Sequence, residues 1–351
     1  MSNIALYIQP FFLALFASIA LTFFVAKMSR KYDLLRMRTT SGSLERPISR
    51  FGGASMIISF LLIFSLSREL VFDVLKTGIA VSSVMILIFG IYDDLKDVSW
   101  KKQLLVQISV ALIMIYSGLT VDYIANPLGG KEFRLDQFVI GDYSVLGSLF
   151  VLFWIVGFMN VMNWLDGSDG LAGGVGFIGA VTLFIISISD IVNQPPLAIM
   201  AIALAGSTLG FLIFNMHPAR IFMGTSGSYF LGFMLSVLAI FSGGKIATAL
   251  LIMGFPIIDA MWVMAVRMRS GNSPFTGDAT HLHYRLLKRG WSQKKIAYFV
   301  YVICAVFAVA AIFFQNIGKI ISLILLFVLA NYLIYEFGIK GEKGKIIDTK
   351  Q

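Results

Sequence analysis

Long apolar runs, each followed by a short polar stretch, make up most of this chain of 351 residues. A helix that crosses a bilayer needs about 20 mostly apolar residues. By this criterion the pattern predicts about eleven transmembrane helices, at residues 5–27, 49–67, 73–91, 103–120, 146–163, 171–190, 197–215, 227–242, 245–265, 295–315 and 318–338. No β-barrel alternation and no internal repeat occurs along the runs, so we expect an all-α polytopic integral membrane protein with residues 1–351 as one domain.

The composition supports this prediction, because 58% of the residues are hydrophobic and only 13% are charged, against about 25% in soluble domains. The net charge of +9 comes from basic residues in the odd-numbered connections and the tail. In a membrane protein this pattern indicates cytoplasmic loops rather than a nucleic-acid-binding surface. We therefore expect the N-terminus outside, the C-terminus in the cytoplasm, and a small external hairpin at residues 121–145.

Two acidic clusters interrupt the apolar runs on the predicted cytoplasmic side. The first contains Asp93 and Asp94, and adjacent carboxylates at a membrane surface repel each other unless they share a cation or a proton. Proteins hold Mg²⁺ through one or two carboxylates together with substrate phosphates and water. The cluster therefore predicts a divalent cation and a nucleotide diphosphate. The alternative is a solvated turn that the acids only decorate.

The second cluster lies between the fifth and sixth runs. Asn160 and Asn163 are three residues apart, as are Asp166 and Asp169, so each pair falls on one side of a helical turn. Amide and carboxylate oxygens suit a hard cation, and amides can also read a nucleobase or a ribose. The start of the next helix favours anions. We expect the two clusters to meet at one site for a cation and a pyrophosphate.

Other polar groups on the same predicted side suit phosphate. Arg46 and Arg50 precede the second run, where they either pair with phosphate oxygens or anchor the chain at the membrane surface. Residues 224–228 offer backbone amides at a helix start, which is typical of a phosphate nest, and Arg220 adds positive charge. His217, beside a proline, is interpreted as structural.

The ninth run contains Asp259, and an ionisable residue inside a span is a functional hypothesis by default. Beyond this run, His281 and His283 are two residues apart, and side chains at this spacing do not stack on a helix. This spacing is poor for a zinc pair, and contact with a phosphate or a leaving group is expected instead. A basic interfacial loop is the alternative.

Taken together, these stretches resemble the polyprenyl-phosphate N-acetylhexosamine-1-phosphate transferase family. The matching pieces are residues 46–53, 93–94, 160–172, 218–228 and 281–283. The resemblance implies transfer of an N-acetylhexosamine 1-phosphate, in the first place N-acetylglucosamine 1-phosphate, from a UDP-sugar to undecaprenyl phosphate with release of UMP. It also implies Mg²⁺, or Mn²⁺ in its place, and leaves a homodimer open.

The family's bacterial members start cell-envelope polysaccharides such as O-antigen and teichoic acid linkage units at the cytoplasmic face of the inner membrane. The resemblance assigns a role to each matching position. The predicted catalytic residues are Asp93, Asp94, Asp166, Asp169, His281 and His283, with Asp93 deprotonating or positioning the acceptor phosphate. The predicted metal ligands are Asp94, Asn163, Asp166 and Thr225. The predicted substrate contacts are Arg46, Arg50, Asn160, Arg220, Gly224, Gly227, Ser228 and Arg285.

The chain departs from the family's pattern at three positions: Thr225 replaces an Asp implied to ligate Mg²⁺, Tyr284 replaces a His, and Ser49 replaces a Pro. A second hypothesis is therefore a catalytically impaired homologue that keeps the nucleotide-sugar pocket as a binding or regulatory membrane protein. A secondary transporter ranks last, because Asp259 is the only candidate charge near the membrane midplane and repeat halves are not visible.

Overall fold

The structure is a computed structural model that describes residues 5–32, 39–40, 43–44, 48–67, 69–70, 73–126, 130–190, 192–242, 246–271 and 280–339. These residues are mostly helical. The helices are α1 (Ala5–Lys31), α2 (Gly52–Leu66), α3 (Val74–Lys96), α4 (Trp100–Tyr116), α5 (Val145–Leu165), α6 (Leu171–Ser187), α7 (Pro195–Asn215), α8 (Gly224–Phe241), α9 (Ile246–Arg269), α10 (Leu282–Lys288), α11 (Gln293–Phe313) and α12 (Asn316–Ile334), followed by the π-helical turn η1 (Tyr335–Ile339).

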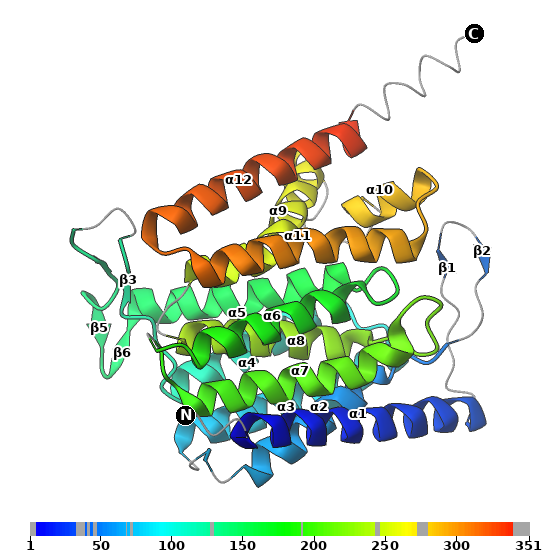
Figure 1. Cartoon of the computed structure of the whole chain (residues 1–351), viewed down its shortest axis with the longest axis horizontal. Helices are drawn as coiled ribbons and strands as arrows, with labels where there is room; N and C mark the ends of the chain where they lie inside the picture. Colours follow the sequence, from blue (N-terminus) through cyan, green and yellow to red (C-terminus); the bar gives the residue numbers. More distant parts are fainter. Residues whose placement is uncertain are drawn as a thin grey trace.

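Three short antiparallel strand pairs accompany the helices and are absent from the all-α prediction. They are β1 (Thr39–Thr40) with β2 (Ser43–Leu44), β3 (Tyr123–Ile124) with β4 (Phe133–Arg134), and β5 (Val139–Ile140) with β6 (Tyr143–Ser144). The last two pairs form the hairpin region expected at residues 121–145. In Figure 1 this region lies at one end of the helices, whereas β1, β2 and α10 lie at the other.

Each predicted apolar segment overlaps one helix, and α10 is an additional element. Eight of the described helices are long and apolar enough to cross a membrane, whereas α2 and α6 are apolar but shorter, with 15 and 17 residues. The chain is therefore a mostly helical, multi-pass membrane protein. The count of eleven crossings and their direction remain predictions.

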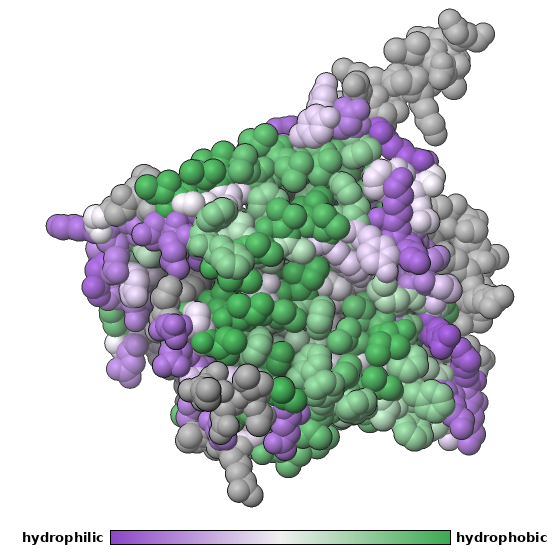
Figure 2. Space-filling view, viewed as in Figure 1, coloured by the Kyte–Doolittle hydropathy of each residue, from purple (hydrophilic) through white to green (hydrophobic). Residues whose placement is uncertain are grey.

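The surface agrees with a membrane setting. On the face shown in Figure 2, apolar residues form a band across the helices, and hydrophilic residues gather toward both ends. Exposed large apolar side chains include Phe16 on α1, Phe153 on α5 and Leu325 on α12. Lipid tails would cover such a surface, which is far broader than the apolar patches of soluble monomers.

Helix α8 is the centre of the bundle, since it packs against α2, α3, α5, α6, α7 and α9 and is more deeply buried than the other candidate spans. Two close approaches depend on missing side chains. A Cβ atom on Gly53 of α2 would overlap the backbone of Gly227, and one on Gly90 of α3 would overlap the backbone of Ser226. These contacts hold the start of α8 between the start of α2 and the last turns of α3.

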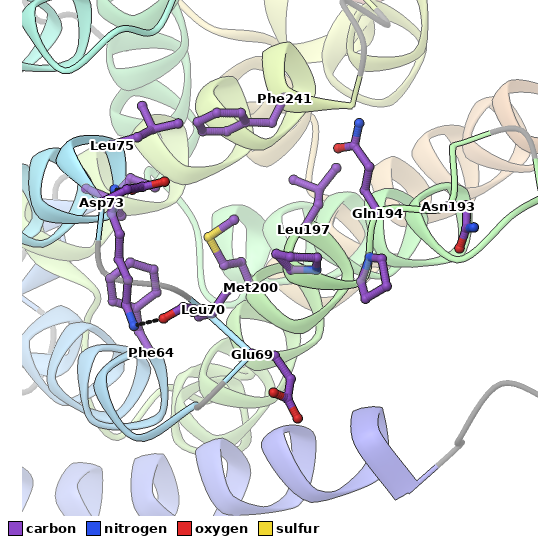
Figure 3. A pocket seen from close by; sticks show the side chains of 14 residues that line it. Phe64, Glu69, Leu70, Asp73, Leu75, Asn193, Gln194, Leu197, Met200 and Phe241 are labelled. Atoms are coloured by element: carbon purple, nitrogen blue, oxygen red, sulfur yellow. Dashed lines mark hydrogen bonds between the residues drawn. The ribbon is translucent and has the colours of Figure 1, made fainter.

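The opposite ends of these helices enclose an apolar pocket of about 410 Å³. Figure 3 shows Phe64 and Asp73 on one side of this space and Leu197 and Gln194 on the other. Lys76, which lines the pocket, is buried, and its Nζ donates a hydrogen bond to the Leu70 carbonyl oxygen at 2.7 Å. The pocket lies at the start of α3 and the end of α8, away from the predicted site residues.

Candidate functional site

A polar pocket of about 320 Å³ lies where α3 and α5 end and where α2 and α8 begin. Its lining residues are Arg50, Asp94, Asn163, Asp166, Phe222, Gly224, Thr225 and Tyr284. Six of these eight were predicted as site residues, namely Arg50, Asp94, Asn163, Asp166, Gly224 and Thr225. They come from four separate stretches of the sequence, so the fold brings together the clusters that the sequence analysis expected to meet.

The two adjacent carboxylates of α3 have different surroundings. Helix α3 continues to Lys96, beyond the predicted end at residue 91, so both acids lie in its last turns and are buried. The oxygens of Asp94, which lines the pocket, accept hydrogen bonds from the Thr225 backbone N–H at 3.1 and 3.2 Å. Asp93 does not line the pocket, because neighbouring side chains are about 100° apart around a helix.

The carboxylate of Asp93 is held by three hydrogen bonds. One oxygen accepts from the Val98 N–H at 2.9 Å and from Gln103 Nε2 at 3.0 Å, and the other accepts from the Thr225 hydroxyl at 2.6 Å. Gln103 in turn accepts from the buried Tyr229 hydroxyl at 3.1 Å. These contacts favour a positioning role for Asp93, and its contact with the acceptor phosphate stays a prediction.

Helix α4 supplies two amides that the sequence analysis did not select. One turn beyond Gln103, the buried Gln107 pairs with Asn160, whose Nδ2 donates to Gln107 Oε1 at 2.7 Å. Asn160, a predicted substrate contact, therefore lies beside the main pocket rather than in its wall. The sequence signal that could have identified these amides is their spacing, because two glutamines four residues apart at the start of an apolar run lie on one side of a helix.

The predicted phosphate nest at residues 224–228 is only partly open. Gly224 has φ of 72°, and a Cβ there would overlap Asp94 and the Arg50 carbonyl, so only glycine fits. Gly227 packs on α2, and Ser228 is fully buried, where its Oγ accepts from Asn163 Nδ2 at 3.0 Å. This bond uses the NH₂ group of Asn163, so the carbonyl oxygen is the acceptor atom that this lining residue can offer to a ligand. Only Gly224 and Thr225 of the nest line the pocket.

Asp169 joins two connections outside the pocket wall. Its Oδ2 accepts from the Ala219 N–H at 3.1 Å and lies 2.9 Å from His217 Nδ1, which fits the structural interpretation of this histidine. Asn215 supports the same junction, because its Oδ1 accepts from the Gly170 N–H at 3.1 Å. Arg220 is exposed beside this junction. The contacts of Asp169 brace the loop after α5 against the end of α7.

The histidine rings correct one expectation. The planes of His281 and His283 are 10° apart with centroids at 5.8 Å, so the rings are stacked. The prediction that they do not stack was wrong because His281 precedes α10 with extended backbone (ψ 152°) and only His283 is helical. The His283 ring covers Gly167, where a Cβ would overlap its Nε2.

Two arginines were also predicted as substrate contacts. Arg285 Nε donates a hydrogen bond to the Thr280 carbonyl oxygen at 2.7 Å. Arg46 lies outside the described residues.

The oxygens in the pocket fit a hard divalent cation. Among the described residues, no group of three or more His, Cys, Asp or Glu side chains is arranged to hold a metal. The pocket nevertheless offers the carboxylates of Asp94 and Asp166 and the carbonyl oxygen of Asn163, and Mg²⁺ commonly takes one or two carboxylates with phosphate and water. Among the described residues of the lining, Arg50 is the only basic one, so a cation in the pocket would pair with the ionised carboxylates of Asp94 and Asp166. The Thr225 hydroxyl donates a hydrogen bond to Asp93 rather than pointing at a metal site.

Comparison with known proteins gives consistent matches. Residues 76–243 match the family described as glycosyl transferase family 4. The chain is 28% identical to the probable undecaprenyl-phosphate N-acetylglucosaminyl 1-phosphate transferase of Bacillus subtilis (strain 168), over 93% of this chain and 90% of that protein. It is 32% identical to the decaprenyl-phosphate N-acetylglucosaminephosphotransferase of Mycobacterium leprae, over 78% and 76% of the two chains. It is also 29% identical to the undecaprenyl-phosphate alpha-N-acetylglucosaminyl 1-phosphate transferase of Pasteurella multocida, over 89% and 88%.

Proposed function

Since the chain belongs to glycosyl transferase family 4, we propose that it transfers N-acetylglucosamine 1-phosphate from a UDP-sugar to undecaprenyl phosphate and releases UMP. The names of the relatives support the acceptor and the transferred group. The observation that carries the proposal is the pocket in which Asp94, Asn163, Asp166 and Arg50 meet although they lie far apart in the sequence.

In the proposed reaction, an oxygen of the lipid phosphate forms a bond to the phosphorus that bears the sugar. The bond from this phosphorus to the bridging oxygen breaks, and its electron pair leaves with UMP. A phosphate monoester has its second pKa near 6, so the acceptor is already largely ionised at neutral pH and needs little help from a base. Catalysis then depends on positioning the two phosphates and stabilising their charge.

The pocket residues have separate proposed roles in positioning the phosphates and stabilising their charge. Asp94, Asp166 and the carbonyl oxygen of Asn163 would hold Mg²⁺, which when bound neutralises charge on the diphosphate. Arg50 pairs with a phosphate oxygen from the start of α2. Asp93 keeps Thr225 and the start of α8 in place, so that the Thr225 N–H orients Asp94. Contacts of His281, His283, Arg220 and Arg285 with the diphosphate remain part of the proposal.

The location of the reaction is proposed from the charge pattern. The site stands at the end of the helices that carries Arg50, Lys96, Lys101 and Lys102, and basic residues mark the cytoplasmic side of bacterial inner membrane proteins. A donor nucleotide would enter from the cytoplasm, and the lipid acceptor would arrive from the inner leaflet. O-antigen and teichoic acid linkage units remain candidate products downstream.

The direct test is UMP release by the purified protein with undecaprenyl phosphate, Mg²⁺ and a panel of UDP-sugars. We expect release that requires the lipid acceptor, is fastest with UDP-N-acetylglucosamine and stops when EDTA removes the metal. Release with another UDP-sugar alone would correct the donor. No release with any of the sugars, in protein that still binds a UDP-sugar, would contradict the proposal.

A second candidate is the catalytically impaired homologue that binds the nucleotide sugar in a regulatory role. The observation that favours it is the hydrogen bond from the Thr225 hydroxyl to Asp93, because this position supplies no carboxylate to the pocket. Thr225→Asp separates the two candidates. A strong rise in transfer from a negligible rate supports the impaired homologue, and substantial Mg²⁺-dependent transfer by the natural protein removes it.

A further inference from the structure

Asp259 is a buried carboxylate in the apolar helix α9 to which the proposed reaction gives no role. Both of its oxygens are used. Oδ2 lies 2.8 Å from His281 Nδ1, and Oδ1 accepts from the Leu282 N–H at 3.0 Å. An ionised carboxylate only accepts hydrogen bonds, so Nδ1 of His281 carries a proton. In neutral His281, Nε2 is then the acceptor nitrogen.

A row of rings leads from this pair to the candidate site. The centroid of the His281 ring lies 6.0 Å from that of Trp164 on α5 and 5.8 Å from that of His283. His283 in turn lies 4.2 Å from the ring of Tyr284, which lines the pocket. Since stacked rings move together in a packed interior, the orientation of His281 affects the wall of the pocket.

We propose that Asp259 is a positioning residue for the transfer reaction. It fixes His281 as the Nδ1–H tautomer and, through the stacked rings, sets His283 over Gly167 and Tyr284 at the pocket. This inference deepens the proposed function and rests on it. Its physical basis is that a buried carboxylate bonded to a histidine selects both the tautomer and the ring orientation.

A purely structural role for Asp259 would be to tie α10 to α9 through the Leu282 N–H. Asp259→Asn separates the two roles. The asparagine carbonyl oxygen still accepts from Leu282, whereas its NH₂ group donates to Nδ1 of His281 and so requires the proton on Nε2. The anchor of α10 therefore remains while the tautomer reverses.

The chain has three histidines, so nitrogen NMR of ¹⁵N-histidine-labelled protein resolves each of them after single substitutions. His217 is an internal reference, because it makes the same kind of contact with Asp169 at 2.9 Å but is far more exposed than His281. We expect His281 in the natural protein to carry its proton on Nδ1, and Asp259→Asn to move it to Nε2 while the His217 signals stay unchanged.

The same variants are assayed for transfer and for thermal unfolding in detergent. With the tautomer reversed and unfolding nearly unchanged, we expect Asp259→Asn to lose about 10² to 10⁴-fold in rate, between the loss of a supporting contact and a catalytic histidine held in the wrong tautomer. Asp259→Glu keeps a carboxylate and is expected to recover part of the rate. Asp190→Asn, the same chemical change at an exposed position after α6, is the matched control and should retain the natural rate.

Any one of three results would overturn the proposal. The first is an Nε2–H tautomer of His281 in the natural protein. The others are unchanged histidine signals and an undiminished rate in Asp259→Asn. If Asp259→Asn does not fold, Asp259→Glu decides, because it must retain the Nδ1–H signal. If the natural protein shows no transfer, the proposed function fails by itself. The positioning role is then tested by UDP-N-acetylglucosamine binding, which Asp259→Asn should weaken about 10-fold or more, as loss of a supporting contact does at metal sites.

Discussion

Three helices, α2, α3 and α8, form both the polar pocket at one end of the bundle and the apolar pocket of Figure 3 at the other. At the polar end, the buried acids Asp93 and Asp94 are bonded across to Thr225 on a different helix. At the apolar end, the buried charge of Lys76 is bonded to the carbonyl oxygen of Leu70, six residues away in the sequence. Two buried carboxylates thus join helices at the first end, whereas at the second a single buried ammonium is bonded to the adjoining connection and lies 5.2 Å from the Phe64 ring of α2.

This difference supports the polar end as the place of the proposed active site. Buried charges are costly, so a fold retains several of them together only where they bind each other or a ligand. The glycine contacts of α8 with α2 and α3 also belong to the polar end, where they fix the start of α8 beside Asp94.

Two aspartates of α3 give the sharpest contrast. Asp94→Asn at the polar end should lower the transfer rate by about 10³-fold or more, since loss of a metal-ligating charge costs several kcal/mol of transition-state stabilisation. Asp73→Asn at the other end should leave the rate unchanged, because Asp73 caps α3 through a bond from the Lys76 N–H, and Asn caps a helix about as well. Initial rates of UMP release measure both variants. Equal rates of UMP release by Asp94→Asn and Asp73→Asn would contradict the proposed difference between the two ends.

Thr225→Val tests the link between α8 and Asp93. Removing the hydroxyl leaves one oxygen of a buried carboxylate without its bond, which should destabilise the protein by about 1.5–3 kcal/mol. Thr225→Ser keeps the hydroxyl and should stay within about 1 kcal/mol of the natural protein. Unfolding midpoints in detergent compare the pair. A Val variant as stable as the Ser variant would show that the 2.6 Å bond to Asp93 contributes nothing.

Gly53→Ala tests the close packing at the polar end. The added Cβ overlaps the backbone of Gly227, and forcing an extra group into a packed interior costs about 1–3 kcal/mol. Gly157 on α5 is the control, since a Cβ there meets nothing within 4 Å. Gly157→Ala should be neutral or stabilising by up to about 1 kcal/mol from helix propensity. Thermal unfolding of both variants measures the difference, and a loss in Gly157→Ala as large as in Gly53→Ala would contradict it.

Lys76→Met should have the smallest effect. The methionine keeps most of the length of the side chain and removes a buried charge, its bond to a neutral carbonyl and its contact with the Phe64 ring, so stability should change by less than about 1 kcal/mol in either direction. The transfer rate should stay within about twofold, because this end holds no part of the proposed reaction. A large fall in the transfer rate of Lys76→Met without a fall in stability would show that the apolar end takes part in the reaction, contrary to the proposal.

Much of the site follows from the sequence because charges are scarce in this chain. Asp94, Asn163 and Asp166 are polar residues at the ends of apolar runs, and a pocket that needs oxygens has few other sources. The family resemblance drew attention to Gly224 and Thr225, and both line the pocket.

The remaining details depend on tertiary contacts that no local pattern encodes. Sequence spacing did not show that Asp93 turns away from the pocket, because that depends on how far α3 continues beyond residue 91. The hydrogen bond from Gln103 to Asp93 depends on the packing of α4 beside the end of α3, which the sequence does not show. The stacking of His281 on His283 depends on an extended residue before α10, where the spacing rule for a helix does not apply.

The convergence of Asp94 and Asp166 on one cation beside the donor diphosphate is tested most directly by electron paramagnetic resonance of Mn²⁺ in the purified protein with UDP-N-acetylglucosamine. The account predicts a single class of bound Mn²⁺ in the natural protein and in Lys76→Met, and its loss in both Asp94→Asn and Asp166→Asn. Full Mn²⁺ binding in either aspartate variant would contradict a shared site.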